Sequence, residues 1–287
     1  MEGSVVTIVL LAALLHASWN ALVKAGPDKY LTTLLVACGA GLVSLPLLPF
    51  AAVPHADSLP WLIASACCQV IYYRLLAAAY KHGDMSQAYP LMRGAAPLLV
   101  ALASVPLLGE RLHWRQDVAV VLICGGVLTL TILRGASVGA DTNANRDARR
   151  RATCYALLNA AVIAAYTMID GVGVRKSGAP AAYTMWLFVL TAAMLLLCST
   201  HRWRELPGYA RAQARVMLLG GVGTLASYGL ALWAMTHAPV AAVAALRETS
   251  ILFAAAIAAL FLRERLAPGR ILAVSLIACG AIVMRLG

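Results

Sequence analysis

The feature that most limits how this chain can fold is its succession of long apolar runs with few charges inside them. Each run approaches the roughly 20 residues that a helix needs to cross about 30 Å of hydrocarbon. Ten runs lie between polar or Pro/Gly breaks: Val5–Val23, Leu31–Val53, Trp61–Tyr80, Ala88–Leu108, Val118–Leu133, Thr153–Val174, Ala181–Ser199, Val216–Met235, Val240–Leu262 and Ile271–Leu286. The sequence therefore predicts an all-α membrane protein with ten transmembrane helices.

Composition and the placement of charge point to the same class of protein. Hydrophobic residues make up 62% of the 287 positions and charged residues only 12%, with a mean hydropathy of +0.81. A soluble domain normally carries about 25% charged residues. The formal charge of +11 lies mostly between the apolar runs, where basic loops set orientation and contact anionic lipid headgroups. We therefore expect membrane lipids, and no nucleic acid, as partners.

Residue patterns for catalysis or cofactor binding are missing from the sequence. The seven cysteines form no CxxC pair and have no metal-ligand spacing with histidine, and neither a Ser/His/Asp set nor a phosphate loop occurs. We therefore expect no cofactor, no metal and no catalytic residues, and the chain is not expected to be an enzyme.

The chain contains an internal repeat with an offset of 154 residues. Arg93 falls on Arg247, and without a gap the segment Glu110-Arg111-Leu112 falls on Glu264-Arg265-Leu266. Chance matches are common among Ala and Leu in so apolar a chain, but arginine pairs and Glu-Arg-Leu triplets are not. The repeat predicts that two halves of the chain share one fold.

The two halves each hold five predicted spans. Residues 1–134 form the first five-helix repeat, a polar and basic linker covers residues 135–151, and residues 152–287 form the second repeat. Because five is odd, the second half enters the membrane from the opposite side. Inverted repeats place a binding site near the midplane between the halves and support alternating access. This arrangement predicts a secondary transporter.

Several segments resemble a known family. The opening LHASWNALVK, the paired GERL and RERL segments, AAYTMIDGVGVR in the sixth span and the repeat together resemble the drug/metabolite transporter (DMT) superfamily, and more narrowly an EamA-type transporter with two EamA domains. The resemblance covers almost the whole chain. It implies a multi-pass protein of the bacterial inner (plasma) membrane that moves small metabolites, with amino acids or related zwitterions and organic anions as the first guess and export as the direction. It also implies that spans one, three, four, six, eight and nine line a central cavity.

Arg93 and Arg247 are the leading candidates for substrate binding. Both lie inside predicted spans, within reach of the midplane, and ionisable groups there are costly enough to suggest function. Two guanidiniums that face one cavity can fork onto a carboxylate or phosphonate. The alternative is that one of them pairs with Glu248 and only pins the two halves together.

Further candidates share helical faces. His16, Trp19 and Asn20 fall at i, i+3 and i+4 in the first span and therefore on one side of the helix. Tyr72 and Tyr73 of the third span, and Tyr166 of the sixth, are rings that could grip the organic part of a ligand. Arg74 of the third span is a further candidate, although its long side chain can also snorkel to the membrane surface.

Two acids are candidates for coupling transport to protons. Glu248 has no acidic counterpart in the first half, where Gly94 matches it. An acid beside an arginine in a low dielectric can titrate near neutral pH, as proton-coupled carriers require. The alternative is a permanently ionised partner of an arginine. Asp170, near the end of the sixth span, is the second candidate, with an interfacial position as its alternative.

Other functions stay open at this stage. An organophosphonate or other anion carrier is the alternative transporter. A non-transporting membrane protein, either an intramembrane enzyme or a lipid-handling scaffold, is the alternative of another class. The assembly is expected to be a monomer or a homodimer.

Loop charge predicts the orientation. The loops after spans one, three, five, seven and nine hold 15 Lys and Arg residues, and the opposite side holds 5. Positive residues accumulate on the cytoplasmic side. We therefore predict that both termini lie outside the cytoplasm, whereas the family resemblance implies that both lie inside it.

Overall fold

A computed structural model describes residues 1–82, 85–135, 143–261 and 268–286. It is 89% helical, and the described residues contain no strand. The main helices are α1 (Gly3–Ala25), α2 (Lys29–Leu47), α3 (Leu59–His82), α4 (Met85–Leu108), α5 (Trp114–Gly135), α6 (Asn143–Ser177), α7 (Pro180–Cys198), α9 (Ala214–Met235), α10 (Val240–Arg247), α11 (Ser250–Phe261) and α12 (Pro268–Leu286). Shorter helices are η1 (Leu48–Phe50), η2 (Ala56–Ser58), η3 (Thr200–Arg202) and α8 (Leu206–Ala212).

Eight helical segments within the described residues are, by length and composition, long and apolar enough to cross a membrane. They correspond to α1, α2, α3, α4, α6, α7, α9 and the pair α10–α11. The apolar part of α12, Ile271–Leu286, is shorter, and α5 is the other helix that the sequence predicted as a span. The prediction of an all-α membrane protein therefore holds, and the count of ten spans stays a prediction.

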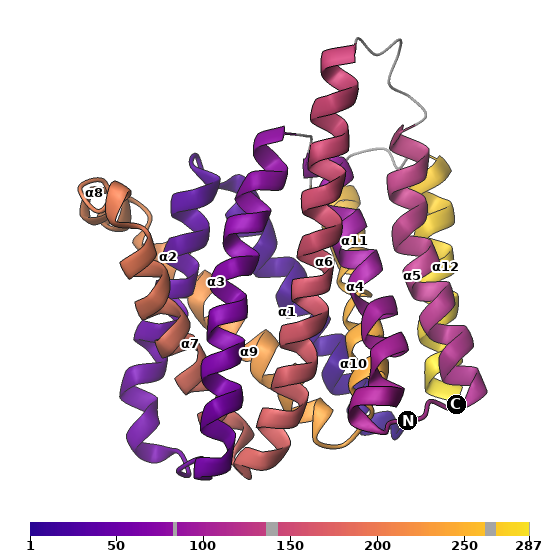
Figure 1. Cartoon of the computed structure of the whole chain (residues 1–287), viewed down its shortest axis with the longest axis horizontal. Helices are drawn as coiled ribbons and strands as arrows, with labels where there is room; N and C mark the ends of the chain where they lie inside the picture. Colours follow the sequence, from indigo (N-terminus) through magenta and orange to yellow (C-terminus); the bar gives the residue numbers. More distant parts are fainter. Residues whose placement is uncertain (83–84, 136–142, 262–267, 287) are drawn as a thin grey trace.

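The helices run up and down in one bundle, with the N- and C-termini at the same end (Figure 1). α8, the end of α5 and the start of α6 lie at the opposite end (Figure 1). Within the bundle α3 packs against α6, and α1 packs against α9. The repeat matches α1 with α6 and α3 with α9. It therefore maps the contact between α3 and α6 onto the contact between α9 and α1.

The contact between α5 and α12 has the same reciprocal character. A Cβ on Gly126 of α5 would meet the Ile277 side chain at 2.8 Å and the Ala273 carbonyl at 2.9 Å. A Cβ on Gly280 of α12 would meet the Ile123 side chain at 2.6 Å and the Ala119 carbonyl at 3.0 Å. The residues on the two sides correspond through the 154-residue offset. The two helices therefore pack as each other's image, with a glycine on each side allowing close approach.

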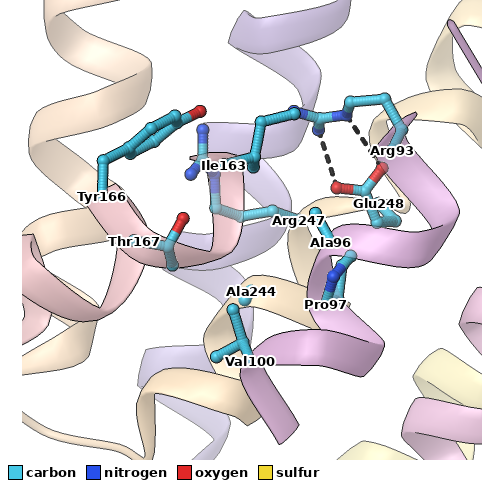
Figure 2. Close-up of a pocket in the computed structure, with 10 residues that line it drawn as sticks. All are labelled: Arg93, Ala96, Pro97, Val100, Ile163, Tyr166, Thr167, Ala244, Arg247 and Glu248. Carbon is cyan, nitrogen blue, oxygen red and sulfur yellow. Dashed lines mark hydrogen bonds and ion pairs between the residues drawn. The ribbon is translucent and has the colours of Figure 1, made fainter. Parts of the chain in front are cut away.

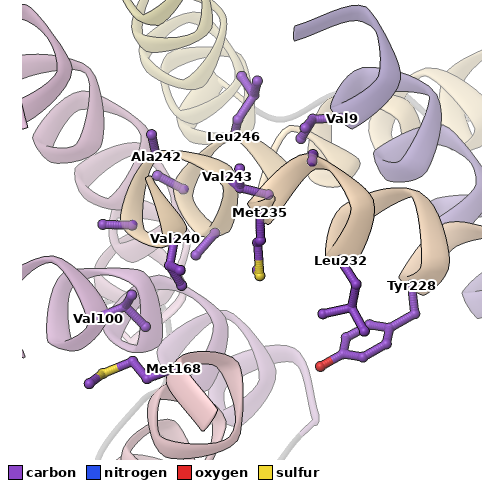
Figure 3. Close-up of a cluster of buried hydrophobic side chains, with 14 of the residues drawn as sticks. Val9, Val100, Met168, Tyr228, Leu232, Met235, Val240, Ala242, Val243 and Leu246 are labelled. Carbon is purple, nitrogen blue, oxygen red and sulfur yellow. The ribbon is translucent and has the colours of Figure 1, made fainter. Parts of the chain in front are cut away.

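The largest buried cluster surrounds α10. Every residue of this short helix is buried, and side chains of α1, α4, α6 and α9 pack around it (Figure 3). Val9, Val100 and Met168 are among them. A helix that is apolar on all sides can be stable only when neighbours cover it completely, and α10 is the element that the other helices enclose.

Two boundaries differ from the sequence prediction. The predicted span Val240–Leu262 is two helices, because the chain leaves the α-helical pattern between α10 and α11. The segment 135–151, predicted as a linker, is helical from Asn143 onward as the start of α6, since its Ala and Arg residues favour a helix. Residues 136–142 of that linker, and the matched triplet Glu264-Arg265-Leu266, lie outside the described residues.

Candidate functional site

A central cavity of about 80 Å³ lies among α1, α3, α4, α6, α7, α9 and α10. Its lining is rich in aromatic side chains and contains no Asp or Glu among the described residues. The lining residues are His16, Trp19, Asn20, Gln69, Tyr72, Tyr73, Tyr89, Arg93, Tyr166, Phe188, Thr224, Ser227, Tyr228 and Arg247.

A second, smaller hollow adjoins the cavity. It encloses about 20 Å³ and shares Arg93, Tyr166 and Arg247 with the larger cavity. Glu248 also lines it (Figure 2). The two spaces therefore meet at the two intramembrane arginines, one contributed by each half of the chain.

Arg93 and Glu248 form a bidentate ion pair (Figure 2). Nε of Arg93 donates a hydrogen bond to Oε2 of Glu248 at 3.0 Å, and Nη2 lies 2.8 Å from Oε1. The two side chains are 12% and 5% exposed. Two parallel contacts between planar groups are the strong form of an Arg–carboxylate pair. The charge of Arg93 is therefore already compensated, and this pair links α4 of the first half to α10 of the second.

Arg247 has a different environment from Arg93. Its guanidinium carbon lies 5.1 Å from the centre of the Tyr228 ring, a cation–π distance. In Figure 2 the side chain points toward Tyr166 and away from Glu248. No carboxylate of the described residues pairs with it, and its Nε is buried without a hydrogen-bond partner. Arg247 therefore presents to the cavity a guanidinium that no described carboxylate contacts directly.

The break between α10 and α11 positions both Arg247 and Glu248. Arg247 is the last residue of α10 and Glu248 is its C-cap. Across the break the backbone bonds are of the i to i+3 type, from Glu248 N–H to the Ala245 carbonyl and from Thr249 N–H to the Leu246 carbonyl. Discontinuous helices at membrane depth occur where the backbone is buried in protein or lines a cavity. The interruption therefore lies at the cavity.

Asp170 is fully buried on α6. Tyr183 donates a hydrogen bond to Oδ1 at 3.1 Å, and Tyr228 donates one to Oδ2 at 2.5 Å. No described Lys or Arg forms an ion pair with this carboxyl group. The ring of Tyr228 also contacts the guanidinium of Arg247. Tyr228 therefore links the carboxyl group of Asp170 to the guanidinium of Arg247.

Most of the predicted binding residues meet at this cavity. His16, Trp19 and Asn20 line it from α1, and the ring of His16 lies edge-on to Trp19 with centroids 5.1 Å apart. Two of the predicted tyrosines, Tyr72 and Tyr166, have ring centroids 6.1 Å apart. Tyr73 lines the cavity beside Tyr72, with their ring centroids 5.0 Å apart. Arg74 is exposed on α3 and lines neither of the two spaces.

Gln69 lies on the same face of α3 as the predicted Tyr72 and Tyr73. Five further lining residues were not predicted from the sequence: Tyr89, Phe188, Thr224, Ser227 and Tyr228. Three of them carry a signal that could have been read, because Thr224, Ser227 and Tyr228 fall at i, i+3 and i+4 on one face of α9. Tyr89 and Phe188 carry no comparable pattern.

A polar cluster joins the helices at the end of the molecule that carries the termini. Glu110 pairs with Arg175 at 2.5 Å and accepts a hydrogen bond from Val240 N–H at 2.8 Å. Arg175 also donates to the Met235 carbonyl at 2.7 Å and to the Ala238 carbonyl at 3.1 Å. The cluster ties the ends of α4, α6 and α9 to the start of α10.

This chain is similar in sequence to a known protein and similar in fold to a solved structure. The Nicotine metabolites export pump subunit NepA of Paenarthrobacter nicotinovorans is 33% identical over 73 residues, which is 25% of this chain and 63% of the relative. The chain thus matches less than two thirds of that protein's length. A solved crystal structure has the same fold, with a TM-score of 0.73, 20% sequence identity, and coverage of 100% of this chain and 98% of the other.

The sequence pattern of one family matches both halves of the chain. That pattern covers residues 3–132 and 150–286. The two matched ranges include the helices that line the cavity and leave out the segment between α5 and α6. The helices long enough to span a membrane, and the matches to both halves, agree that this is a multi-pass transporter: the chain belongs to the EamA-like transporter family.

Proposed function

We propose that this protein is a secondary transporter of small organic metabolites that works by alternating access between two inverted five-helix repeats. Ten crossings of the bacterial inner membrane and export of the substrate are part of this proposal. The observation that carries it is the central cavity, where Arg93 of the first half and Arg247 of the second meet at the same space. Amino acids, related zwitterions and organic anions are the substrates considered.

The inverted arrangement is supported by the packing. The contacts of α3 with α6 and of α1 with α9 are related by the repeat. The helices α5 and α12 run antiparallel (Figure 1), and their reciprocal glycine contacts also follow the repeat. A pseudo-two-fold axis in the membrane plane produces this pattern and lies at the substrate site in transporters of this type.

Alternating access requires one end of the cavity to open while the other closes. The cluster of Glu110 and Arg175 joins the helix ends at the side of the termini. We propose that this cluster holds that side closed in the state described here and separates in the other state. Because its side chains are partly exposed, at 12% and 35%, breaking the ion pair costs less than it would in the membrane interior.

Proton coupling is part of the proposal, and Asp170 is the better candidate for it. The bidentate pair with Arg93 gives Glu248 a permanent partner, whereas tyrosine hydroxyls surround Asp170. The titratable and charged groups that face Asp170 are Cys68 of α3, Tyr166 of its own helix, Tyr183 of α7, Tyr228 of α9 and Arg247 of α10. Tyr228, which contacts both Asp170 and Arg247, would relay a change of charge to the cavity.

Transport is tested with the purified full chain in proteoliposomes. The vesicles are loaded with a mixture of the twenty amino acids and several mono- and dicarboxylic acids, and the compounds released are quantified by mass spectrometry. We expect release of a subset above protein-free vesicles, reduced at least tenfold by Arg247→Gln. Arg215→Gln is the matched control, because Arg215 is exposed at the start of α9. Release no faster than from protein-free vesicles would overturn the proposed function.

A further inference from the structure

We infer that the cavity selects aromatic monocarboxylates that lack an ammonium group, in preference to zwitterionic amino acids and to dianions. This inference rests on the proposed transport function and narrows its substrate class. It revises the expectation of amino acids as first substrates, and it follows from three observations: the charges of the lining, its hydrogen-bonding groups and its aromatic walls.

When Asp170, which is linked to Arg247 through Tyr228, is protonated, the charges around the cavity add up to a single positive charge. Arg93 and Glu248 neutralise each other at contact distances of 2.8 and 3.0 Å. The remaining charge is that of Arg247, which is 9% exposed and has no carboxylate partner among the described residues. When the transporter closes around a ligand and excludes water, an unpaired charge is strongly penalised. A ligand with one negative charge makes the closed site neutral, whereas a zwitterion leaves it positive and a dianion leaves it negative.

The unsatisfied indole N–H of the lining favours an acceptor. Nε1 of Trp19 and Nε2 of His16 are buried without hydrogen-bond partners in the described part of the chain. Nε2 of His16 donates or accepts according to the tautomer of the ring, so Trp19 carries the preference. An indole N–H can only donate, so it suits a carboxylate oxygen and cannot bind an ammonium. Gln69 and Asn20 offer amide oxygens, but neutral acceptors leave an ammonium's charge uncompensated. Buried donors of this kind normally find a partner, and a ligand carboxylate beside Arg247 would supply it.

The walls of the cavity are aromatic from several directions. The rings come from α1, α3, α4, α6, α7 and α9: Trp19, Tyr72, Tyr73, Tyr89, Tyr166, Phe188 and Tyr228. Pairs among them are already edge-to-face, as between Tyr72 and Tyr166 and between Phe188 and Tyr228. A planar ring can add further offset or edge-on contacts, which stabilise binding beyond area burial. An aliphatic chain of the same volume cannot form them.

Binding of four matched compounds to the full chain in lipid nanodiscs tests the inference. Isothermal titration calorimetry at pH 7.5 compares 3-phenylpropionate with phenylalanine, which has the same skeleton and an added ammonium. It also includes the neutral 3-phenylpropionamide and phenyl phosphate, a dianion because the second pKa of a phosphate monoester is about 6. We expect 3-phenylpropionate to bind at least tenfold more tightly than each of the other three. A fifth compound, 3-cyclohexylpropionate, should bind roughly threefold to tenfold more weakly than its aromatic analogue.

Two variants separate this account from a general loss of structure. Arg247→Gln should weaken binding of 3-phenylpropionate at least tenfold, and Arg215→Gln should leave it unchanged. Glu248→Gln should free Arg93 and raise the charge of the lining by one, so that phenyl phosphate becomes the preferred ligand. A reversed preference is a gain that a misfolded protein cannot produce.

Several outcomes would overturn the inference while leaving transport intact. Phenylalanine binding as tightly as 3-phenylpropionate would show that an ammonium is accepted. Tighter binding of phenyl phosphate to the unchanged protein would favour the organophosphonate alternative. Failure of all the aromatic compounds to bind, together with release of amino acids in the vesicle assay, would contradict the substrate class and support the proposed function.

Discussion

Two acids lie close to the cavity, and their neighbours give them different chemistry. Glu248 contacts Arg93 through both oxygens. Protonation of a carboxyl group held in this way would leave a buried guanidinium unpaired. Asp170 contacts the hydroxyls of Tyr183 and Tyr228, which can remain hydrogen-bonded in either protonation state by reorienting their O–H groups.

Asp170→Asn is expected to abolish the pH dependence of transport. The amide has nearly the shape of a protonated carboxyl group but cannot release a proton, so the rate should become flat with pH while some transport remains. The measurement is the initial rate of release from proteoliposomes at a series of pH values, with and without a pH gradient. Glu248→Gln is the comparison. Retained pH dependence in Asp170→Asn and its loss in Glu248→Gln would assign coupling to Glu248 instead.

Sequence reasoning at the residue scale found the two arginines and the His16 face, because charged and polar residues inside apolar spans stand out. It also left open whether Glu248 pairs with Arg93 or Arg247, since both are near it in the repeat. Distance decided this: Glu248 contacts Arg93 from another helix, 155 positions away in the chain. Sequence neighbours need not be contact neighbours on a helix, where adjacent side chains diverge by about 100°.

At the scale of elements, periodicity located the helices well but missed the interruption of the ninth span. Neither Pro nor Gly marks the segment Arg247-Glu248-Thr249-Ser250, so no helix-breaking residue signals the break. Burial around α10 and the hydroxyl of Thr249, which donates to the Leu246 carbonyl at 2.7 Å, stabilise the irregular backbone instead. Such tertiary support is invisible to local patterns.

Two adjacent glycines of α5 should respond oppositely to the same substitution. Gly126→Ala places a methyl group against Ile277 and the Ala273 carbonyl, so we expect a loss of about 1–3 kcal/mol in the free energy of unfolding. Gly125→Ala meets no atom within 4 Å and should be neutral or stabilising by up to about 1 kcal/mol, because alanine favours a helix. Unfolding in detergent and SDS mixtures measures both. Equal stability of the two variants would contradict the close packing of α5 on α12.

At the scale of the whole molecule, the two termini share one end (Figure 1). The loops at the opposite end include Arg202, Arg204 and Arg211 around α8. An end rich in positive residues normally faces the cytoplasm. Some of the positive residues counted for this prediction, such as Arg263 and Arg265, lie outside the described ranges. Their contribution to the count rests on the sequence alone.

A C-terminal reporter fusion should therefore be active outside the cytoplasm. We expect alkaline phosphatase fused after Gly287 to be active and a green fluorescent protein fusion at the same position to be dark. Replacing Arg202, Arg204, Arg211 and Arg215 by Gln should weaken this preference, because the charge difference between the two sides becomes smaller. Fluorescence of the unchanged fusion would show that both termini face the cytoplasm.

The sequence by itself determined the class of protein, the approximate helix positions, the repeat and the family, because apolar length and repeated residues are properties of the chain. It also identified most of the side chains that face the cavity. Only the tertiary structure decided which charges compensate each other, where the ninth span breaks and that Asp170 is fully buried among hydroxyl groups. These features depend on distances between residues of different helices, and packing in three dimensions sets those distances.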